Sequence, residues 1–558
     1  MAEATVQAEP AAAAADPGPG GARRERHRDT SRLRWLAGYL TAALVLFLCY
    51  LRTSEAMPVT SDGASNALQA WDILHGNLLL HGWTLSDVSF YTVEMPQYVL
   101  VEALHGLGPA DVHICAAITY TLVVLLAGLL AKGTATGREG LIRVLIASGI
   151  MIAPNLGHGS FVLLLSPDHV GTGIPLLLAF LLLDRLLDRT YPVSGGTAPS
   201  VRKLWWAPPA VGLILVWAQV NDPLAVTVGV VPVVAVCGLR AYRALVQRRE
   251  PVREHWLTLG VGVAAAVSAG VADAIVRIIR SLGGYRLAPL HTAFAPSASW
   301  PAHVSQTADG ILQLYGVNFT AGKLGPSVAV SAVHLAGVAL AAWAFCRVLR
   351  RFVTWPDPIA QILTAAIVVN VTAYILSTLP TGSGYDSREI ANVLAFGAVL
   401  AGRTLAARLA AARLLPALAV VACGYLLALG HGAVRAPAPV PDTALVQWLG
   451  AHHLTNGIGT YAQDNRIGVD SRGAVVMVAP QFGAHSGPRK DPLFEERAAD
   501  FDPRLHYANF VIFNPRDGAL IHLSPSRVIR AFGRPARVYH DGPWTIMTWD
   551  KNLLADIR

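Results

Sequence analysis

Residues 35–72 read WLAGYLTAALVLFLCYLRTSEAMPVTSDGASNALQAWD, and this stretch decides the fold. Residues 35–51 carry no charge and are long enough to begin a membrane span, which needs about 20 mostly apolar residues. A polar segment with Asp62 follows at once. Apolar side chains then recur at helical spacing at Ala64, Ala67, Leu68, Trp71 and Leu74. The stretch therefore predicts a signal-anchor span, followed by an amphipathic helix that lies on the membrane with its polar side in water.

The composition extends this pattern to most of the chain. Of the 558 residues, 53% are hydrophobic and only 14% are charged, and the mean hydropathy is +0.44. A soluble domain carries about 25% charged residues, and lipid excludes charge. We therefore expect a polytopic α-helical membrane protein with about eleven transmembrane helices. The expected spans lie near residues 33–52, 112–131, 141–155, 171–187, 204–220, 223–240, 256–276, 326–346, 359–378, 389–406 and 414–430.

The basic residues predict the orientation of these spans. With the N-terminus in the cytoplasm, the outer connecting segments hold few cations, whereas the inner segments are rich in arginine, as the positive-inside rule requires. The outer cations are Arg277, Arg280, Arg286, Lys323 and Arg388. The net charge of +8 thus lies against the cytoplasmic leaflet and does not indicate nucleic-acid binding. We expect a multi-pass protein of the cell membrane with an extracytoplasmic C-terminal domain.

Three regions differ in composition. Residues 1–30 are rich in Ala, Gly, Pro and Arg and predict a disordered cytoplasmic tail, and residues 31–430 form the transmembrane domain. Within it, residues 53–111 form a long outer loop that has acids but no Lys or Arg. Residues 431–558 predict a soluble extracytoplasmic α/β domain. Its expected helices lie at 443–453 and 526–532 and its expected strands at 474–479, 509–513, 537–540 and 545–549.

This layout resembles the GT-C superfamily of integral membrane glycosyltransferases, and the chain is similar to actinobacterial membrane proteins of that class. The resemblance covers the whole chain and is carried locally by residues 61–72, 384–388 and 448–554. It implies an enzyme of the hexosyl- or pentosyltransferase class. Its partners would be membrane lipids, a polyprenyl-phosphate sugar donor and an extracytoplasmic glycan, lipid or protein acceptor. The family's catalytic base is an acid in the first outer loop, and Asp62 stands at that place.

Several polar residues at outer span boundaries extend this hypothetical site. Asp62 is the catalytic candidate, although an Asp at a helix start also serves as an N-cap. Asp168 and His169 form a titratable pair that could support catalysis, with a helix cap as the alternative for Asp168. Arg388 could bind the carrier phosphate through its forked donors, or else pair with Asp386 or Glu389.

Two further acids are substrate-binding candidates. Glu94 lies in the long outer loop, where a solvated loop acid is the favoured alternative. Asp222 precedes a proline between two spans, a pattern that is also typical of an ordinary turn.

The sequence offers no metal-binding signature and no nucleotide-binding glycine motif. We expect no certain cofactor, although Asp62 and another acid could hold a divalent cation. The five cysteines lie in apolar segments and predict no disulfide framework. The family often carries paired acids where this chain has only Ser61-Asp62-Gly63. A non-catalytic lipid- or glycan-binding relative therefore stays open. A transporter also stays open, although the spans show no internal repeat.

Overall fold

The computed structural model describes residues 20–154, 158–165, 169–190, 204–252, 255–289, 292–318, 326–411, 415–440, 442–482, 487–490, 495–514 and 523–558. The chain divides into two compact units, residues 1–46 and 47–558, and each is described by itself. Helix α1 (Gly20–Glu55) begins in the first unit, within the segment expected to be a tail. Its apolar side chains at Leu36, Leu40 and Leu44 are exposed, as in a helix that faces lipid.

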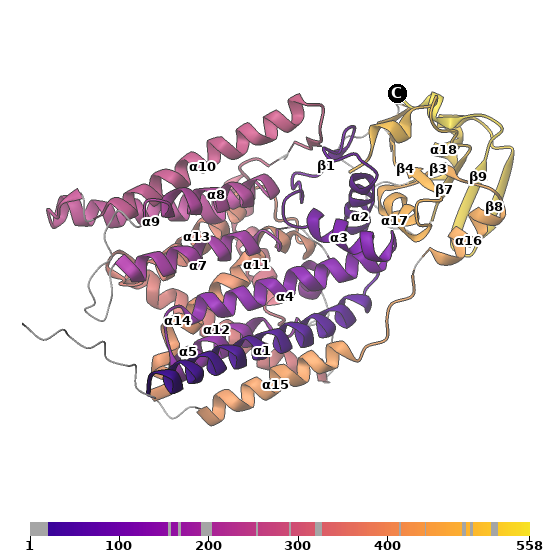
Figure 1. Cartoon of the computed structure of the whole chain (residues 1–558). Coiled ribbons are helices and arrows are strands. Elements are labelled where there is room, and N and C mark those ends of the chain that lie inside the picture. The colour runs from indigo at the N-terminus through magenta and orange to yellow at the C-terminus, as the bar shows by residue number, and fades with distance from the viewer. Residues whose placement is uncertain are drawn as a thin grey trace, which may run out of the picture. The chain divides into compact units, whose positions relative to one another are not determined.

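In the second unit, a helix lies at each remaining expected span, and Figure 1 shows many of these helices running side by side. Six described helices are long and apolar enough to cross a membrane, and the chain is a multi-pass membrane protein. The remaining helices are shorter or less apolar. The helices of the bundle are α4 (Ala110–Lys132), α5 (Gly137–Met151), α6 (His158–Leu164), α7 (Gly173–Thr190), α8 (Ala207–Asn221), α9 (Val231–Tyr242), α10 (Trp256–Ser281), α11 (Trp300–Leu314), α12 (Pro326–Arg350), α13 (Pro358–Leu376), α14 (Asn392–Ala411) and α15 (Leu415–Ala433).

Small residues let these helices approach closely, as is common inside membranes. A Cβ atom added at Gly402 of α14 would lie 2.7 Å from the carbonyl oxygen of Arg143 in α5. An ion cluster joins α14 to two further helices. The Arg403 guanidinium on α14 lies 2.7 Å from both Asp184 of α7 and Asp357, which precedes α13. These contacts hold helices α5, α7, α13 and α14 together.

The long loop of residues 53–111, which the sequence predicts to be the first outer loop, contains α2 (Ser61–Leu74), β1 (Thr84–Leu85) and α3 (Met95–His105). Helix α2 forms where helical spacing predicts it, but its expected exposure is wrong. Asn66 and Gln69, which lie off the apolar stripe of this helix, are fully buried. The reason is that α2 packs against α17 (Tyr461–Asp470) of the C-terminal region as well as against α3. The polar side of α2 is therefore an internal interface.

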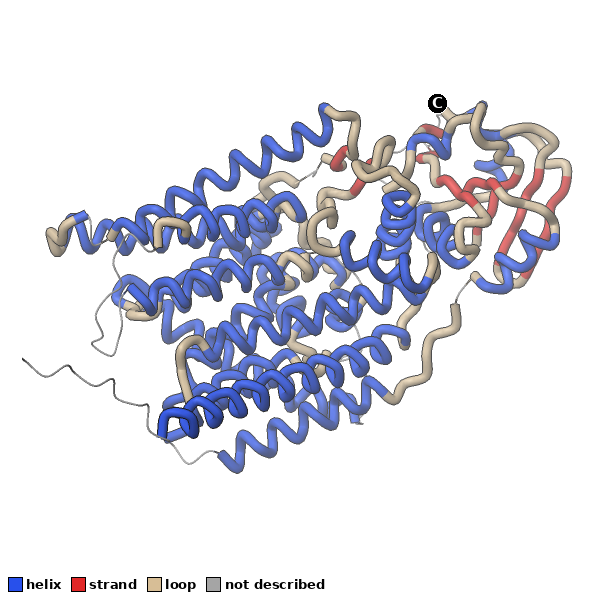
Figure 2. The backbone as a smooth tube through the Cα atoms, in the orientation of Figure 1, coloured by secondary structure: helices blue, strands red, loops and turns tan. Residues whose placement is uncertain are grey.

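The C-terminal region, residues 442–558, contains a mixed five-stranded sheet of order β4-β3-β7-β9-β8, drawn in red in Figure 2. The strands β3, β4 and β7 are parallel, and β9 pairs antiparallel with both β7 and β8. Alternate side chains of β7 pack into two apolar clusters on opposite faces of the sheet. Because both faces are buried, all four residues of the strand, FVIF, are apolar. The sheet strands are β3 (Asn456–Ile458), β4 (Val476–Val478), β7 (Phe510–Phe513), β8 (Arg537–Asp541) and β9 (Trp544–Thr548).

All four predicted strands and both predicted helices, α16 (Thr443–Ala451) and α18 (Pro525–Phe532), are present. Strand β3 and helix α17 were not predicted. The short segment of β3 contains a glycine, and the ring of Phe510 occupies the space where a side chain at Gly457 would lie. Short two-stranded pairs also occur. They are β1 with β2 (Arg286–Leu287) and β5 (Gln481–Phe482) with β6 (Pro488–Arg489).

Candidate functional site

Asp62 lies in the first turn of α2, but it does not cap the helix. Thr60 is the N-cap, and its hydroxyl accepts a hydrogen bond from the Gly63 N–H at 3.1 Å. The Asp62 carboxylate instead accepts hydrogen bonds from two phenols. The Tyr385 hydroxyl donates to Oδ2 at 2.7 Å, and the Tyr461 hydroxyl donates to Oδ1. The capping alternative for Asp62 is therefore wrong.

Arg388 lies beside this carboxylate on η7 (Tyr385–Ile390), a short 3-10 helix that immediately precedes α14. Its Nη1 atom is 4.0 Å from Asp62 Oδ2, and its guanidinium carbon lies 4.4 Å from the centre of the Tyr385 ring. The carboxylates near Arg388 are those of Asp62 and Glu389, whereas the Asp386 carboxylate accepts hydrogen bonds from the backbone N–H and the hydroxyl of Thr381. The predicted base and the predicted phosphate ligand thus face each other.

His169 connects Arg388 to a second buried acid. The Nε2 atom of His169 lies 3.0 Å from Glu389, and its Nδ1 atom lies 2.8 Å from Asp222. The Arg388 Nε atom is 3.7 Å from Glu389. Five groups therefore form one connected chain, which we call the ionic network. Its members in order are Asp62, Arg388, Glu389, His169 and Asp222.

The charges at the His169 end of the ionic network support each other. Burial alone would lower the pKa of His169, but the carboxylates of Asp222 and Glu389 raise this pKa well above its ordinary value. Burial alone would raise the pKa of Asp222, whereas His169 and the Thr172 hydroxyl hold this pKa below its ordinary value. His169 is consequently an imidazolium between two carboxylates, and Asp222 is not merely part of a turn.

The local chain conformation fixes His169 in this position. Its φ angle of 55° lies in the left-handed region, which few residues other than glycine adopt. The Asn392 side chain donates a hydrogen bond to the His169 carbonyl at 3.1 Å. Asp222 is fixed from the opposite side, because it accepts hydrogen bonds from the Thr172 hydroxyl and the Leu224 N–H.

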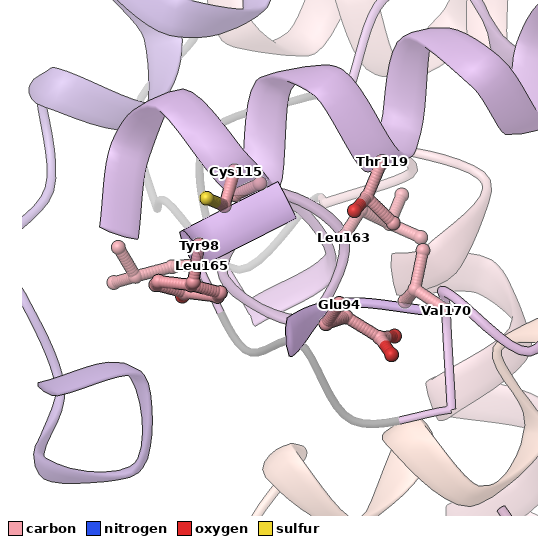
Figure 3. Close-up of a pocket in the computed structure, with 8 residues that line it drawn as sticks. Glu94, Tyr98, Cys115, Thr119, Leu163, Leu165 and Val170 are labelled. Atoms are coloured by element: carbon pink, nitrogen blue, oxygen red, sulfur yellow. The ribbon is translucent and has the colours of Figure 1, made fainter. Parts of the chain in front are cut away.

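Glu94 lies at the N-cap position of α3 and is only 2% exposed, so its interpretation as a solvated loop acid is wrong. The Asn221 side-chain amide donates to Glu94 at 2.8 Å, and Asn221 directly precedes Asp222. Glu94 therefore lies next to the ionic network. Figure 3 shows Glu94 with Tyr98 and Cys115 beside a cavity of about 10 Å³, which has room for a single water.

Five of the six predicted site residues are thus brought together, and Asp168 lies outside the described residues. Tyr461 and Glu389 were not predicted as site residues. Glu389 appeared only as an alternative partner for Arg388, and Tyr461 is 399 positions from the acid that it contacts. Local patterns cannot identify such a partner. Of the other cations that the sequence predicts on the outer side, Arg286 is exposed on β2, and Lys323 lies outside the described residues.

The C-terminal region packs directly against the helix that carries Asp62. The Ser61 hydroxyl contacts the Tyr461 carbonyl and lies 3.1 Å from Asp464. The Ser65 hydroxyl donates to the Glu495 carbonyl at 3.1 Å. In addition, the backbone N–H of Thr84 in the first outer loop donates to the carbonyl of Glu496. Helix α2 is therefore held between α17 and the segment around residue 495.

A buried carboxyl pair lies behind this contact. Burial raises the pKa of Asp464, and burial together with the Asp464 charge raises the pKa of Glu496. The pair therefore holds a proton more readily than exposed carboxyl groups do. No group of three or more His, Cys, Asp or Glu side chains suited to a metal ion is found among the residues that the structure describes.

Comparison with known proteins identifies the fold. No protein-family model matches the sequence, and no curated protein matches it by sequence. Among solved structures, ArnT from Cupriavidus metallidurans bound to undecaprenyl phosphate aligns with 92% of this chain and 97% of its own chain, with 15% identity and a TM-score of 0.52. The Archaeoglobus fulgidus oligosaccharyltransferase tethered to an acceptor peptide aligns with 85% of this chain and 69% of its own, with 11% identity and a TM-score of 0.48. The likeness to ArnT shows that the present chain has the GT-C fold.

Proposed function

We propose that this chain is a glycosyltransferase that transfers a sugar from a polyprenyl-phosphate donor to an acceptor hydroxyl on the extracytoplasmic face of the membrane. The main observation behind this proposal is that the Arg388 Nη1 atom lies 4.0 Å from Asp62 Oδ2. These residues come from loops separated by most of the bundle, and they place a carboxylate beside a cation. Such a pair supplies both charges that transfer from a phosphate carrier requires.

The two residues take complementary parts in the reaction. Asp62 accepts the proton of the acceptor hydroxyl while the acceptor oxygen forms a bond to the anomeric carbon. The bond between that carbon and the phosphate oxygen breaks, and the electron pair stays on the leaving phosphate. Arg388 stabilises the phosphate charge through its guanidinium donors.

An apolar cavity within the bundle suits the isoprenoid part of the donor. This cavity of about 330 Å³ lies among α11, α12, α13 and α14 and is lined mainly by aliphatic side chains. Val393 and Gly397 of α14 line it, and Arg388 lies only a few residues before them. In this proposal, the apolar chain of a donor whose phosphate lies at Arg388 occupies this cavity. We place the site on the extracytoplasmic side, in agreement with the arginine distribution along the sequence.

The test is sugar transfer from a panel of radiolabelled polyprenyl-phosphate sugars in membranes that contain the full-length chain. Asp62→Asn and Arg388→Ala should each lower transfer by about 10²-fold or more, which is the scale for a general base or an electrostatic donor. A matched control is the exposed pair Asp273–Arg277 on α10, with the variants Asp273→Asn and Arg277→Ala. These should transfer at the wild-type rate, and all variants should accumulate to equal levels.

Other outcomes discriminate between the functions. Undiminished transfer by Asp62→Asn would remove that residue as the base. If the wild type transfers no sugar but retains a labelled polyprenyl phosphate, and Arg388→Ala does not retain it, the chain is a lipid-binding relative. Movement of the labelled lipid across the membrane without transfer would instead indicate a carrier.

A further inference from the structure

Tyr461 is the residue of the C-terminal region that contacts the proposed base. It begins α17, and its hydroxyl donates to Asp62 Oδ1, across 399 positions of sequence. A phenol that donates to a carboxylate forms a charge-assisted hydrogen bond, which is stronger than a bond between neutral groups. Asp62 thus has one phenol on each oxygen, because Tyr385 donates to Oδ2.

The backbone holds this phenol in place. The carbonyl of Tyr461 accepts a hydrogen bond from the Ser61 hydroxyl, and Ser61 is the immediate neighbour of Asp62. One turn further along α17, Asp464 also lies within hydrogen-bond distance of Ser61. The side chain and the backbone of Tyr461 therefore contact two consecutive residues of α2. This double contact fixes the direction from which the phenol approaches the carboxylate.

The phenol is also kept neutral. Burial and the carboxylates of Asp62 and Glu495 raise the pKa of Tyr461 well above its ordinary value. The hydroxyl consequently stays protonated and stays a donor over the whole physiological pH range. A donor of this kind favours the ionised form of the carboxylate that it contacts.

We propose that Tyr461 is a positioning residue of the transfer site, which orients the Asp62 carboxylate and keeps it anionic, so that the C-terminal region completes the site. This inference rests on the proposed function, because it assumes that Asp62 is the base. It gives the C-terminal region a direct role in the chemistry.

Other charged groups near Asp62 bear on the experiment. From η7 come Tyr385 and Arg388, and from the C-terminal region come Tyr461, Asp464 and Glu495. Helices α3 and α4 also pack against α2 and carry Glu102, Asp111 and His113. The other groups all remain in Tyr461→Phe, which removes only the Tyr461 hydroxyl and keeps the ring. A change in that variant therefore reports the phenol itself.

The test measures Asp62 directly and does not depend on turnover. The protonated carboxyl of Asp62 is followed by infrared spectroscopy as the C=O band that is missing in Asp62→Asn, and it is titrated in the full-length wild type and in Tyr461→Phe. The midpoint should rise by about one pH unit in Tyr461→Phe, since one unit corresponds to a tenfold change in the preference for the charged form. Tyr507→Phe is the matched control, because Tyr507 is an exposed tyrosine of the same region. It should titrate as the wild type does.

Activity gives a second readout. If sugar transfer is found, the acid limb of its pH profile should move upward in Tyr461→Phe by the same amount as the infrared midpoint. An unchanged midpoint in a normally folded Tyr461→Phe protein would overturn the inference, even if transfer were slower. Faster transfer with an unchanged midpoint would also overturn it, because Tyr461 would then only obstruct the acceptor. Absence of transfer in the wild type would count against the proposed function alone.

Discussion

The strongest stability prediction concerns His169. The substitution His169→Gln removes an imidazolium that lies 2.8 Å from Asp222 and 3.0 Å from Glu389, with only 4% of the histidine side chain exposed. A hydrogen bond to a charged group contributes about 1.5–3 kcal/mol, and breaking a buried ion pair costs about 3–5 kcal/mol. Asp222 keeps its bonds to the Thr172 hydroxyl and the Leu224 N–H, so part of its charge stays compensated. We therefore expect His169→Gln to lower the free energy of unfolding by about 3–5 kcal/mol near pH 6.

The pH dependence gives this prediction a second, independent signature. The folded-state pKa of His169 is raised, so the stability that its charge contributes is fully present below the ordinary value of 6.5. This contribution declines at higher pH and is lost once the pH has risen through the raised folded-state pKa. The pKa of Asp222 is lowered, so Asp222 affects stability only in acid. Its stabilising contribution is lost as the pH falls below the ordinary aspartate pKa of 3.8.

The assay is thermal unfolding of the purified protein in detergent, from pH 5 to pH 10, for the wild type and His169→Gln. The difference in unfolding temperature between the wild type and His169→Gln should be largest at pH 5–6.5 and should become smaller in alkaline solution. His540→Gln is a control, because His540 lies exposed on the edge strand β8. A gap that is absent at pH 6, or that widens with rising pH, would refute the assignment of His169 as a buried cation.

Two further predictions concern the bundle and the metal dependence. Arg403→Met leaves the carboxylates of Asp184 and Asp357 without their shared cation. It should lower the free energy of unfolding by about 3–5 kcal/mol, measured by thermal unfolding. An unfolding temperature equal to that of the wild type would contradict the structural role of this cluster. Sugar transfer should persist in excess chelator, because two phenols donate hydrogen bonds to Asp62 and the Arg388 guanidinium already places a positive charge beside this carboxylate. Transfer that stops with chelator and returns with added Mg²⁺ would show instead that Asp62 and another acid hold a cation.

Much of the site could be predicted from sequence because the membrane restricts where polar residues lie. A charged side chain in lipid is costly, so the acids and the arginine at span ends gather in the loops of one face. The alternation of the spans then places Asp62, His169, Asp222 and Arg388 on the same side, and the structure connects these residues through one ionic network. This argument needs only the order of the spans and not their packing.

The partners within the site could not be predicted in the same way. Glu94 resembles an ordinary loop acid in the sequence, and its burial depends on Asn221, which is 127 positions away. Tyr461 lies in a region whose strands could be identified, but the docking of α17 onto α2 depends on side-chain complementarity and not on periodicity. The burial of Asn66 and Gln69 could not be predicted either. These polar side chains suit a water-exposed face, and the sequence of α2 alone does not show that a second helix covers them.

The ionic network explains which of its carboxylates can react. Charge alternates along it, so each cation lies between two carboxylates and the cost of burying the charges is partly offset. The two terminal carboxylates differ in their surroundings. Asp222 is fully buried and is held by a hydroxyl and a backbone N–H, whereas the side chain of Asp62 is 21% exposed and is held by two phenols. Since an incoming hydroxyl can reach only a carboxylate with exposed surface, we assign the proposed proton transfer to Asp62, while the buried Asp222 contributes to the raised pKa of His169.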